Sequence, residues 1–273
     1  MDYILYILIF YVGAIFGSFI TLAIDRIPLK QDITHKHSYC PHCKHKLSFL
    51  DVIPIFSYLV LGGRCRYCKK KIGPRYILLE ILTGVTFVLF AASIKLSIVF
   101  IDIQNIIYFI VGIIYLTILF IIAGIDRKKK CIEKSILMIG YIIVTIYMIY
   151  LYVVENMIDA NIYRYVIYLL LACILIFLSI IHLKKKGKDS YTIDVLLLSL
   201  FMVLYTYETI YIFTVIITLI AIVIQLLLHK LVQRKNKYVR KVKKENSKIP
   251  IGFYMCTANI VILIILNFTL LYV

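Results

Sequence analysis

The chain has 273 residues, of which 63% are hydrophobic, and its formal net charge is +17, from 31 Lys and Arg against 14 Asp and Glu. A soluble domain is nearer half apolar, so the composition excludes an ordinary soluble globular protein. The basic balance could indicate nucleic-acid binding. In a chain this apolar, positive charge on the cytoplasmic loops of a membrane protein explains it better, and we expect a lipid bilayer and no nucleic acid as partner.

Eight apolar runs approach or reach the roughly 20 residues that cross a bilayer as a helix. In chain order they cover residues 3–24, 76–96, 104–125, 135–154, 162–183, 191–207, 210–229 and 252–272. The sixth is the weakest, because it is short and carries Asp194 near its start. No small-residue cleavage site follows the first run, so we expect it to stay as a helix. The sequence predicts an all-α polytopic membrane protein of about eight transmembrane helices.

The basic residues gather in alternate loops. Four segments hold 29 of the 31 Lys and Arg, namely residues 25–75, 126–134, 184–190 and 230–250. The positive-inside rule places all four on the cytoplasmic side, with both termini outside. A miscounted helix would spread the basic loops over both faces. The pattern therefore predicts a multi-pass protein of the plasma membrane whose largest loop, residues 25–75, faces the cytoplasm.

That loop, called the cysteine loop below, carries two Cys-x-x-Cys pairs, Cys40 with Cys43 and Cys65 with Cys68. Two such turns can close a tetrahedral site of four thiolates, as in structural zinc sites. Four protein ligands leave no open position, so the zinc is expected to be structural. Alternatives are a redox dithiol pair, a coincidence of spacing, or replacement of one cysteine by His42 or His45 as ligand.

Two aspartates lie at the ends of predicted spans. Asp126 ends the third span, and Asp194 starts the sixth. By the predicted topology both are at the cytoplasmic ends of their helices, hence at the same depth. Carboxylates at a membrane are costly and therefore functional candidates. If brought together they can share a proton, the arrangement of aspartic proteases. For Asp126, a solvated residue balanced by Arg127–Lys130 is the alternative.

A series of short motifs is shared with one family. In order, the chain carries Gly17-Ser-Phe19, Asp25-Arg-Ile-Pro28, the first cysteine pair, Ile53-Pro54, Gly63-Arg-Cys65, Ile72-Gly-Pro-Arg-Tyr76 with Glu80, and Lys248-Ile-Pro-Ile-Gly252. Over nearly its whole length the chain thus resembles the bacterial type IV prepilin peptidases, leader peptidases and N-methyltransferases of the GxGD-type aspartic membrane protease family.

The resemblance implies a function and a set of site residues. Asp126 and Asp194 match the two catalytic aspartates that cleave the leader of prepilin or pseudopilin precursors at the cytoplasmic face. The family also methylates the new N-terminus with S-adenosylmethionine, an activity associated with the cysteine loop around Gly63; this cofactor rests on the resemblance alone. The chain departs from the family at Tyr191 and Ile193, which stand where the family has the glycines of its Gly-x-Gly-Asp motif.

The expected organisation is therefore a first transmembrane helix at 1–24, a zinc-binding loop domain at 25–75, and a seven-helix aspartic peptidase domain at 76–273. The bulky residues before Asp194 leave an alternative, a diverged and non-catalytic membrane assembly or scaffold protein. A transporter or channel would also suit eight helices. We rank it last, because the carboxylates sit at helix ends rather than at the membrane midplane.

Overall fold

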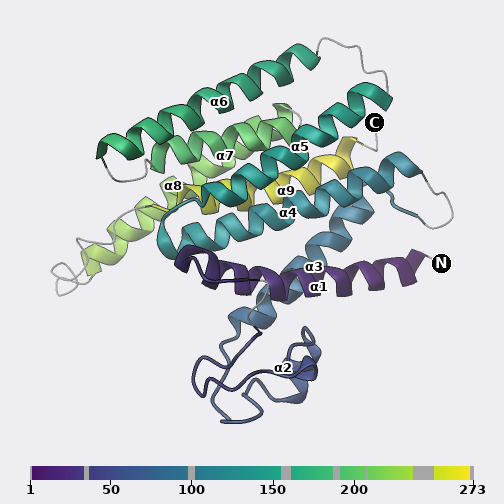
Figure 1. The fold of residues 1–273 in the computed structure, drawn as a ribbon, viewed down its shortest axis with the longest axis vertical. Coiled ribbons are helices and arrows are strands. Elements are labelled where there is room, and N and C mark those ends of the chain that lie inside the picture. Colours follow the sequence, from purple (N-terminus) through teal and green to yellow (C-terminus); the bar gives the residue numbers. More distant parts are fainter. Residues whose placement is uncertain are drawn as a thin grey trace. The chain divides into compact units, whose positions relative to one another are not determined.

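The computed structural model describes residues 2–33, 37–97, 102–154, 161–186, 191–206, 208–235 and 249–270. These residues are almost entirely helical and contain no strand, only two isolated β-bridges. The helices, drawn in Figure 1, are α1 (Asp2–Arg26), η1 (Ile27–Leu29), η2 (Phe49–Asp51), α2 (Phe56–Val60), α3 (Arg75–Ser93), α4 (Ile103–Lys129), α5 (Lys134–Val154), α6 (Asn161–Lys186), α7 (Tyr191–Tyr205), α8 (Glu208–Lys235) and α9 (Ile251–Leu270).

Each of the eight predicted spans is a helix. Seven of them are long and apolar enough to cross a membrane, and α7, the weakest in sequence, is a shorter apolar helix of 15 residues. Large apolar side chains point outward along these helices; on α6, for example, Leu170, Ile174 and Phe177 are 54% to 63% exposed. Such surfaces are rare in soluble proteins. The prediction of an all-α polytopic membrane protein is confirmed.

The chain forms two compact units. The first consists of Met1–Thr117 with Asn267–Val273, and the second of Ile118–Leu266. The cysteine loop lies in the first unit with α1 and α3. The end of α4, α5 to α8 and most of α9 lie in the second.

Helices α1 and α3 approach each other closely in the first unit through small residues. A Cβ added at Gly13 would lie 2.7 Å from the Cα of Gly84 and 2.9 Å from the carbonyl oxygen of Thr83. The Thr83 hydroxyl donates a hydrogen bond of 2.8 Å to the Gly13 carbonyl. Small residues and hydroxyl bonds of this kind hold helices together where no hydrophobic force acts between them.

Replacing Gly13 by valine is expected to destabilise the protein by about 1–3 kcal/mol, because the new side chain meets backbone that cannot move aside. The measurement is the thermal unfolding midpoint of the purified protein in detergent. Gly73→Ala is the control, since a Cβ there meets nothing within 4 Å. Equal midpoints for the two variants would contradict the close α1–α3 contact.

The second unit is tied together by buried polar groups between apolar helices. The Tyr141 hydroxyl of α5 donates to the carbonyl of Leu197 in α7 at 2.7 Å. The side-chain amide of Asn259 in α9 donates to the Thr214 hydroxyl of α8 at 3.2 Å. A buried polar group without a partner would cost free energy, so these bonds fix how the helices pack. This packing positions the ends of α4, α7 and α9.

Candidate active site and metal centre

The two cysteine pairs fold as equivalent turns. The Lys44 amide donates to the Cys40 carbonyl at 2.9 Å, and the Lys69 amide donates to the Cys65 carbonyl at 3.0 Å. Both lysines adopt a left-handed backbone, with φ of 60° and 56°. Each turn is closed by an isolated β-bridge, one from Tyr39 to Lys46 and one from Arg64 to Lys71. The turns therefore present their thiols in the same way.

The four thiols converge on one point. The Sγ atoms of Cys40, Cys43, Cys65 and Cys68 all lie within 4.8 Å of one another, and those of Cys40 and Cys68 are 3.9 Å apart. A tetrahedral zinc ion with Zn–S bonds of 2.3 Å requires sulfur atoms about 3.8 Å apart. The cluster expected from the spacing is confirmed, and its geometry fits zinc.

His42 and His45, the alternative ligands considered from the sequence, contact other residues. The Nδ1 atom of His42 lies 3.4 Å from the ammonium nitrogen of Lys70. The ring of His45 packs on Tyr67, with ring centroids 3.6 Å apart. Within the described residues, the group of side chains able to share one metal ion contains the four cysteines and neither histidine.

The Cys40 thiol is prepared for metal binding. Burial opposes its ionisation, but hydrogen bonds from the backbone amides of Cys43 and His42 prevail and lower its pKa from 9.0 to about 7. Zinc binds the thiolate, so these hydrogen bonds favour the ligand form of Cys40 near neutral pH, whereas the pKa of the Cys43 thiol in the same turn is raised to about 11.

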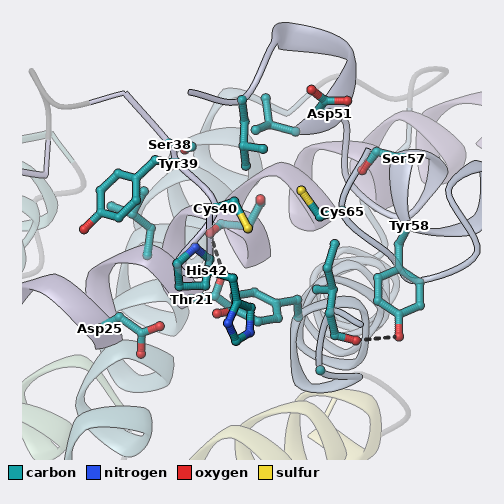
Figure 2. Close-up of a pocket in the computed structure, with 18 of the residues that line it drawn as sticks. Thr21, Asp25, Ser38, Tyr39, Cys40, His42, Asp51, Ser57, Tyr58 and Cys65 are labelled. Carbon is teal, nitrogen blue, oxygen red and sulfur yellow. Dashed lines mark hydrogen bonds between the residues drawn. The ribbon is translucent and has the colours of Figure 1, made fainter. Parts of the chain in front are cut away.

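A cavity of about 600 Å³ lies beside the cysteine cluster. Its wall combines the end of α1, the two cysteine turns and the inner side of α2. Figure 2 shows Cys40 and Cys65 on this wall, with Ser57 and Tyr58 of α2 beside them. The Tyr58 hydroxyl donates to the Ile72 carbonyl at 3.3 Å. The volume is that of a site for a small molecule.

In the second unit, Asp126 is fully buried near the end of α4. The Tyr191 hydroxyl, from the first residue of α7, donates to its carboxylate and lies 2.9 Å from Oδ1 and 3.0 Å from Oδ2. The Phe253 amide, in the first turn of α9, donates to Oδ2 at 2.9 Å. The Gly252 amide donates to the Tyr191 hydroxyl at 3.3 Å. Three helices separated in sequence thus meet at one carboxylate.

Asp194 is also buried, one turn beyond Tyr191 on α7. Residues three apart share a helix face, so Asp194 lies on the face whose first residue contacts Asp126. Its Oδ1 atom is 3.6 Å from the ammonium nitrogen of Lys134, at the start of α5. The structure therefore joins Asp126 to α7 through Tyr191, and it joins Asp194 to α5 through an ion pair.

Sequence reasoning did not foresee four of these contacts, which are made by Tyr191, Gly252, Phe253 and Lys134. The amides of Gly252 and Phe253 belong to the start of a helix after Pro250, where free N–H groups bind anions, and that signal was present in the sequence. The hydroxyl of Tyr191 and the ammonium of Lys134 carried no comparable signal. Their partners lie 65 and 60 residues away in the chain, and only the packed helices bring them together.

Comparison with known proteins bears on the first part of the chain. Residues 11–94 match the family model described as the bacterial peptidase A24 N-terminal domain. This segment is similar to that N-terminal domain. It includes α1, the cysteine loop and α3.

Curated relatives support the same assignment. Proteins named prepilin leader peptidase/N-methyltransferase are similar to this chain: 43% identical over 81 residues in Myxococcus xanthus, 31% over 134 residues in Klebsiella pneumoniae and 39% over 89 residues in Vibrio cholerae. These matches cover 30%, 47% and 30% of this chain, and 24%, 55% and 35% of the relatives. No solved structure matches the chain. The resemblance to the prepilin peptidases is confirmed for the part of the chain that these matches cover.

Proposed function

We propose that the chain is a membrane aspartic endopeptidase that removes the leader peptide of type IV prepilin-like precursors. The observation that carries this proposal is the buried carboxylate of Asp126, held against the helix face that bears Asp194. The match of residues 11–94 to the bacterial peptidase A24 N-terminal domain supports it. The names of the relatives supply the substrate class. Cleavage would take place at the cytoplasmic face, where the basic loops are expected.

The two aspartates would divide the chemistry between them. Asp126 accepts hydrogen bonds from the Tyr191 hydroxyl and the Phe253 amide, and such donors favour a charged carboxylate. In this proposal Asp126 is the base that takes a proton from water. Asp194 carries the proton that polarises the scissile carbonyl, as in other carboxylate pairs. In the resting protein Lys134 pairs with the charged Asp194, so Asp194 takes up that proton from solvent only when substrate binds.

We propose that three segments of the chain have separate roles. Residues 1–24 anchor the chain, residues 25–75 form a loop domain held by zinc on Cys40, Cys43, Cys65 and Cys68, and residues 76–273 carry the peptidase. Bound zinc would stabilise the fold of the loop without taking part in cleavage, because four thiolates complete its coordination.

The relatives' names also include N-methyltransferase. We propose that methylation of the new N-terminus takes place at the cavity beside the cysteine cluster, with S-adenosylmethionine as donor. The cavity offers the carboxylates of Asp25 and Glu80 for a sulfonium ion and the ring of Tyr39 for a base. Incubation of a cleaved prepilin with the protein and S-adenosylmethionine should add the mass of one methyl group. An unchanged mass would refute this part alone.

The proposed peptidase is tested by cleavage of prepilin-type substrates from the protein's own genome, using purified protein in detergent. A product shortened by the leader, identified by mass spectrometry, is the expected result. An intact substrate from a folded and zinc-loaded protein would refute the peptidase and favour the non-catalytic scaffold.

Replacing Tyr191 by phenylalanine is expected to lower kcat for cleavage by about 10- to 100-fold and to leave KM nearly unchanged. The hydroxyl donates to a charged group, and a bond of this kind contributes about 1.5–3 kcal/mol. Tyr254→Phe is the matched control on α9. If the two variants cleave equally well, the Tyr191 hydroxyl does not support Asp126 during the reaction.

A further inference from the structure

Five large apolar side chains on the cysteine loop stand out from the molecule. Phe49 and Leu50 of η2 and Phe56, Leu59 and Val60 of α2 are 60% to 82% exposed. They are called the apolar patch below. Helices η2 and α2 lie against each other, and residues 56, 59 and 60 share one face of a helix. The loop connects α1 and α3, so this surface lies outside the spanning helices.

The opposite side of η2 and α2 faces the cavity. Asp51, Ser57 and Tyr58 line the cavity beside the cysteine cluster, as Figure 2 shows. The patch residues therefore point away from the core of the loop. Exposed apolar patches rimmed by polar residues mark surfaces that bind a membrane or another molecule.

The stretch of chain that carries the patch is strongly basic. Between Lys44 and Lys71, seven lysine and arginine residues are exposed, of which Arg66, Lys70 and Lys71 also line the cavity. One acidic residue, Asp51, lies in this stretch, and it is paired with Arg66 at 2.5 Å. A surface of this charge attracts anionic lipid headgroups and repels a basic peptide.

The start of α2 is fixed to a spanning helix. The Ile55 amide, immediately before α2, donates to the Glu80 carboxylate at 2.8 Å. Glu80 lies five residues inside α3, which corresponds to about 8 Å along the helix axis. Amphipathic segments that lie on membranes bury their apolar face about 5–10 Å into the boundary between headgroups and acyl chains. With the membrane boundary taken at Arg75, where the candidate span of α3 begins, the Glu80 contact holds the start of α2 at that depth.

We propose that the apolar patch docks the cysteine loop on the surface of the bilayer that α1 and α3 cross, with anionic lipid headgroups bound by exposed lysines and arginines of the same segment. The loop then lies on the membrane rather than free in solution. This surface is separate from the proposed peptidase site and does not depend on it.

The chain contains no tryptophan, so a single introduced tryptophan reports its own surroundings. Phe56→Trp places this probe in the patch, and Tyr67→Trp, another exchange of one exposed aromatic ring for a larger one, is the control in the second cysteine turn. Each full-length variant is placed alone in nanodiscs of phosphatidylcholine and phosphatidylglycerol, with or without brominated acyl chains.

We expect brominated lipid to quench the Phe56→Trp emission about twofold more strongly than that of Tyr67→Trp, because the patch reaches the acyl boundary. Adding Leu59→Glu and Val60→Glu to the probe variant should remove the excess quenching while zinc content stays the same. Equal quenching of the two probes would overturn the proposal. It would also be overturned if the Phe56→Trp emission responded only after a prepilin peptide was added, since the patch would then bind a polypeptide.

Discussion

Replacing Asp126 by asparagine is expected to reduce the rate of prepilin cleavage about 10³-fold, the contribution typical of a positioned general base. Asparagine keeps the size of the side chain, and its carbonyl can still accept from the Phe253 amide, which now donates to Oδ2 at 2.9 Å. It cannot take a proton from water. The loss should therefore appear in kcat, measured from the rate at which the shortened product forms.

Asp194→Asn should have an effect of similar size, and the double variant should be little worse than either single one, because the two groups act as a unit. Asp102→Asn is the matched control. Asp102 lies just before the other end of α4, where its carboxylate accepts from the Gln104 amide at 3.0 Å. Full activity of the Asp126→Asn variant would refute the aspartic mechanism. A wild-type protein that cleaves no prepilin would refute the proposed function itself.

Replacing Cys40 and Cys65 together by serine is expected to abolish zinc binding and unfold the cysteine loop. Both residues are buried and occupy equivalent places in the two turns. A loop of this size has little apolar core, and the five apolar side chains of the patch are not buried within it. Small domains of this kind take most of their folding free energy from the metal.

Two measurements test this expectation. The number of zinc ions per chain, determined by elemental mass spectrometry, should fall from about one to none. The loop should then be cut rapidly by added protease, while the helices in detergent stay intact. Cys173→Ser, which removes an exposed and solitary thiol on α6, should change neither result. Zinc retained by the double variant would show that other ligands hold it.

The helices were predictable because a bilayer leaves the backbone few choices. Every spanning segment must satisfy its own amide and carbonyl groups, so a long apolar run becomes a helix with ends close to those of the run. The structure follows this for each run, from α1 at Asp2–Arg26 to α9 at Ile251–Leu270. The cysteine cluster was predictable for a similar reason, since a Cys-x-x-Cys turn fixes two ligands locally.

The surroundings of the two aspartates could not be read in the same way. Sequence reasoning treated Tyr191 as a bulky replacement for a glycine before Asp194. In the structure its hydroxyl crosses to Asp126, 65 residues earlier in the chain. Such a contact depends on how α4 and α7 are rotated, and hydropathy contains no information about rotation. The catalytic roles of Asp126 and Asp194 stay a prediction.

The contact between Asp126 and the start of α9 bears on how this protein can evolve. The carboxylate accepts from the Phe253 amide at the start of α9, so it fastens this helix in addition to its proposed role as a base. A lineage that gave up cleavage would still be selected to keep an acceptor at this position, whether aspartate or asparagine. Folding and chemistry thus place the same residue under two separate selective pressures. Asparagine can accept the hydrogen bond but cannot act as a base. A descendant with asparagine at this position is therefore expected to have lost cleavage, whereas one with aspartate can have kept it.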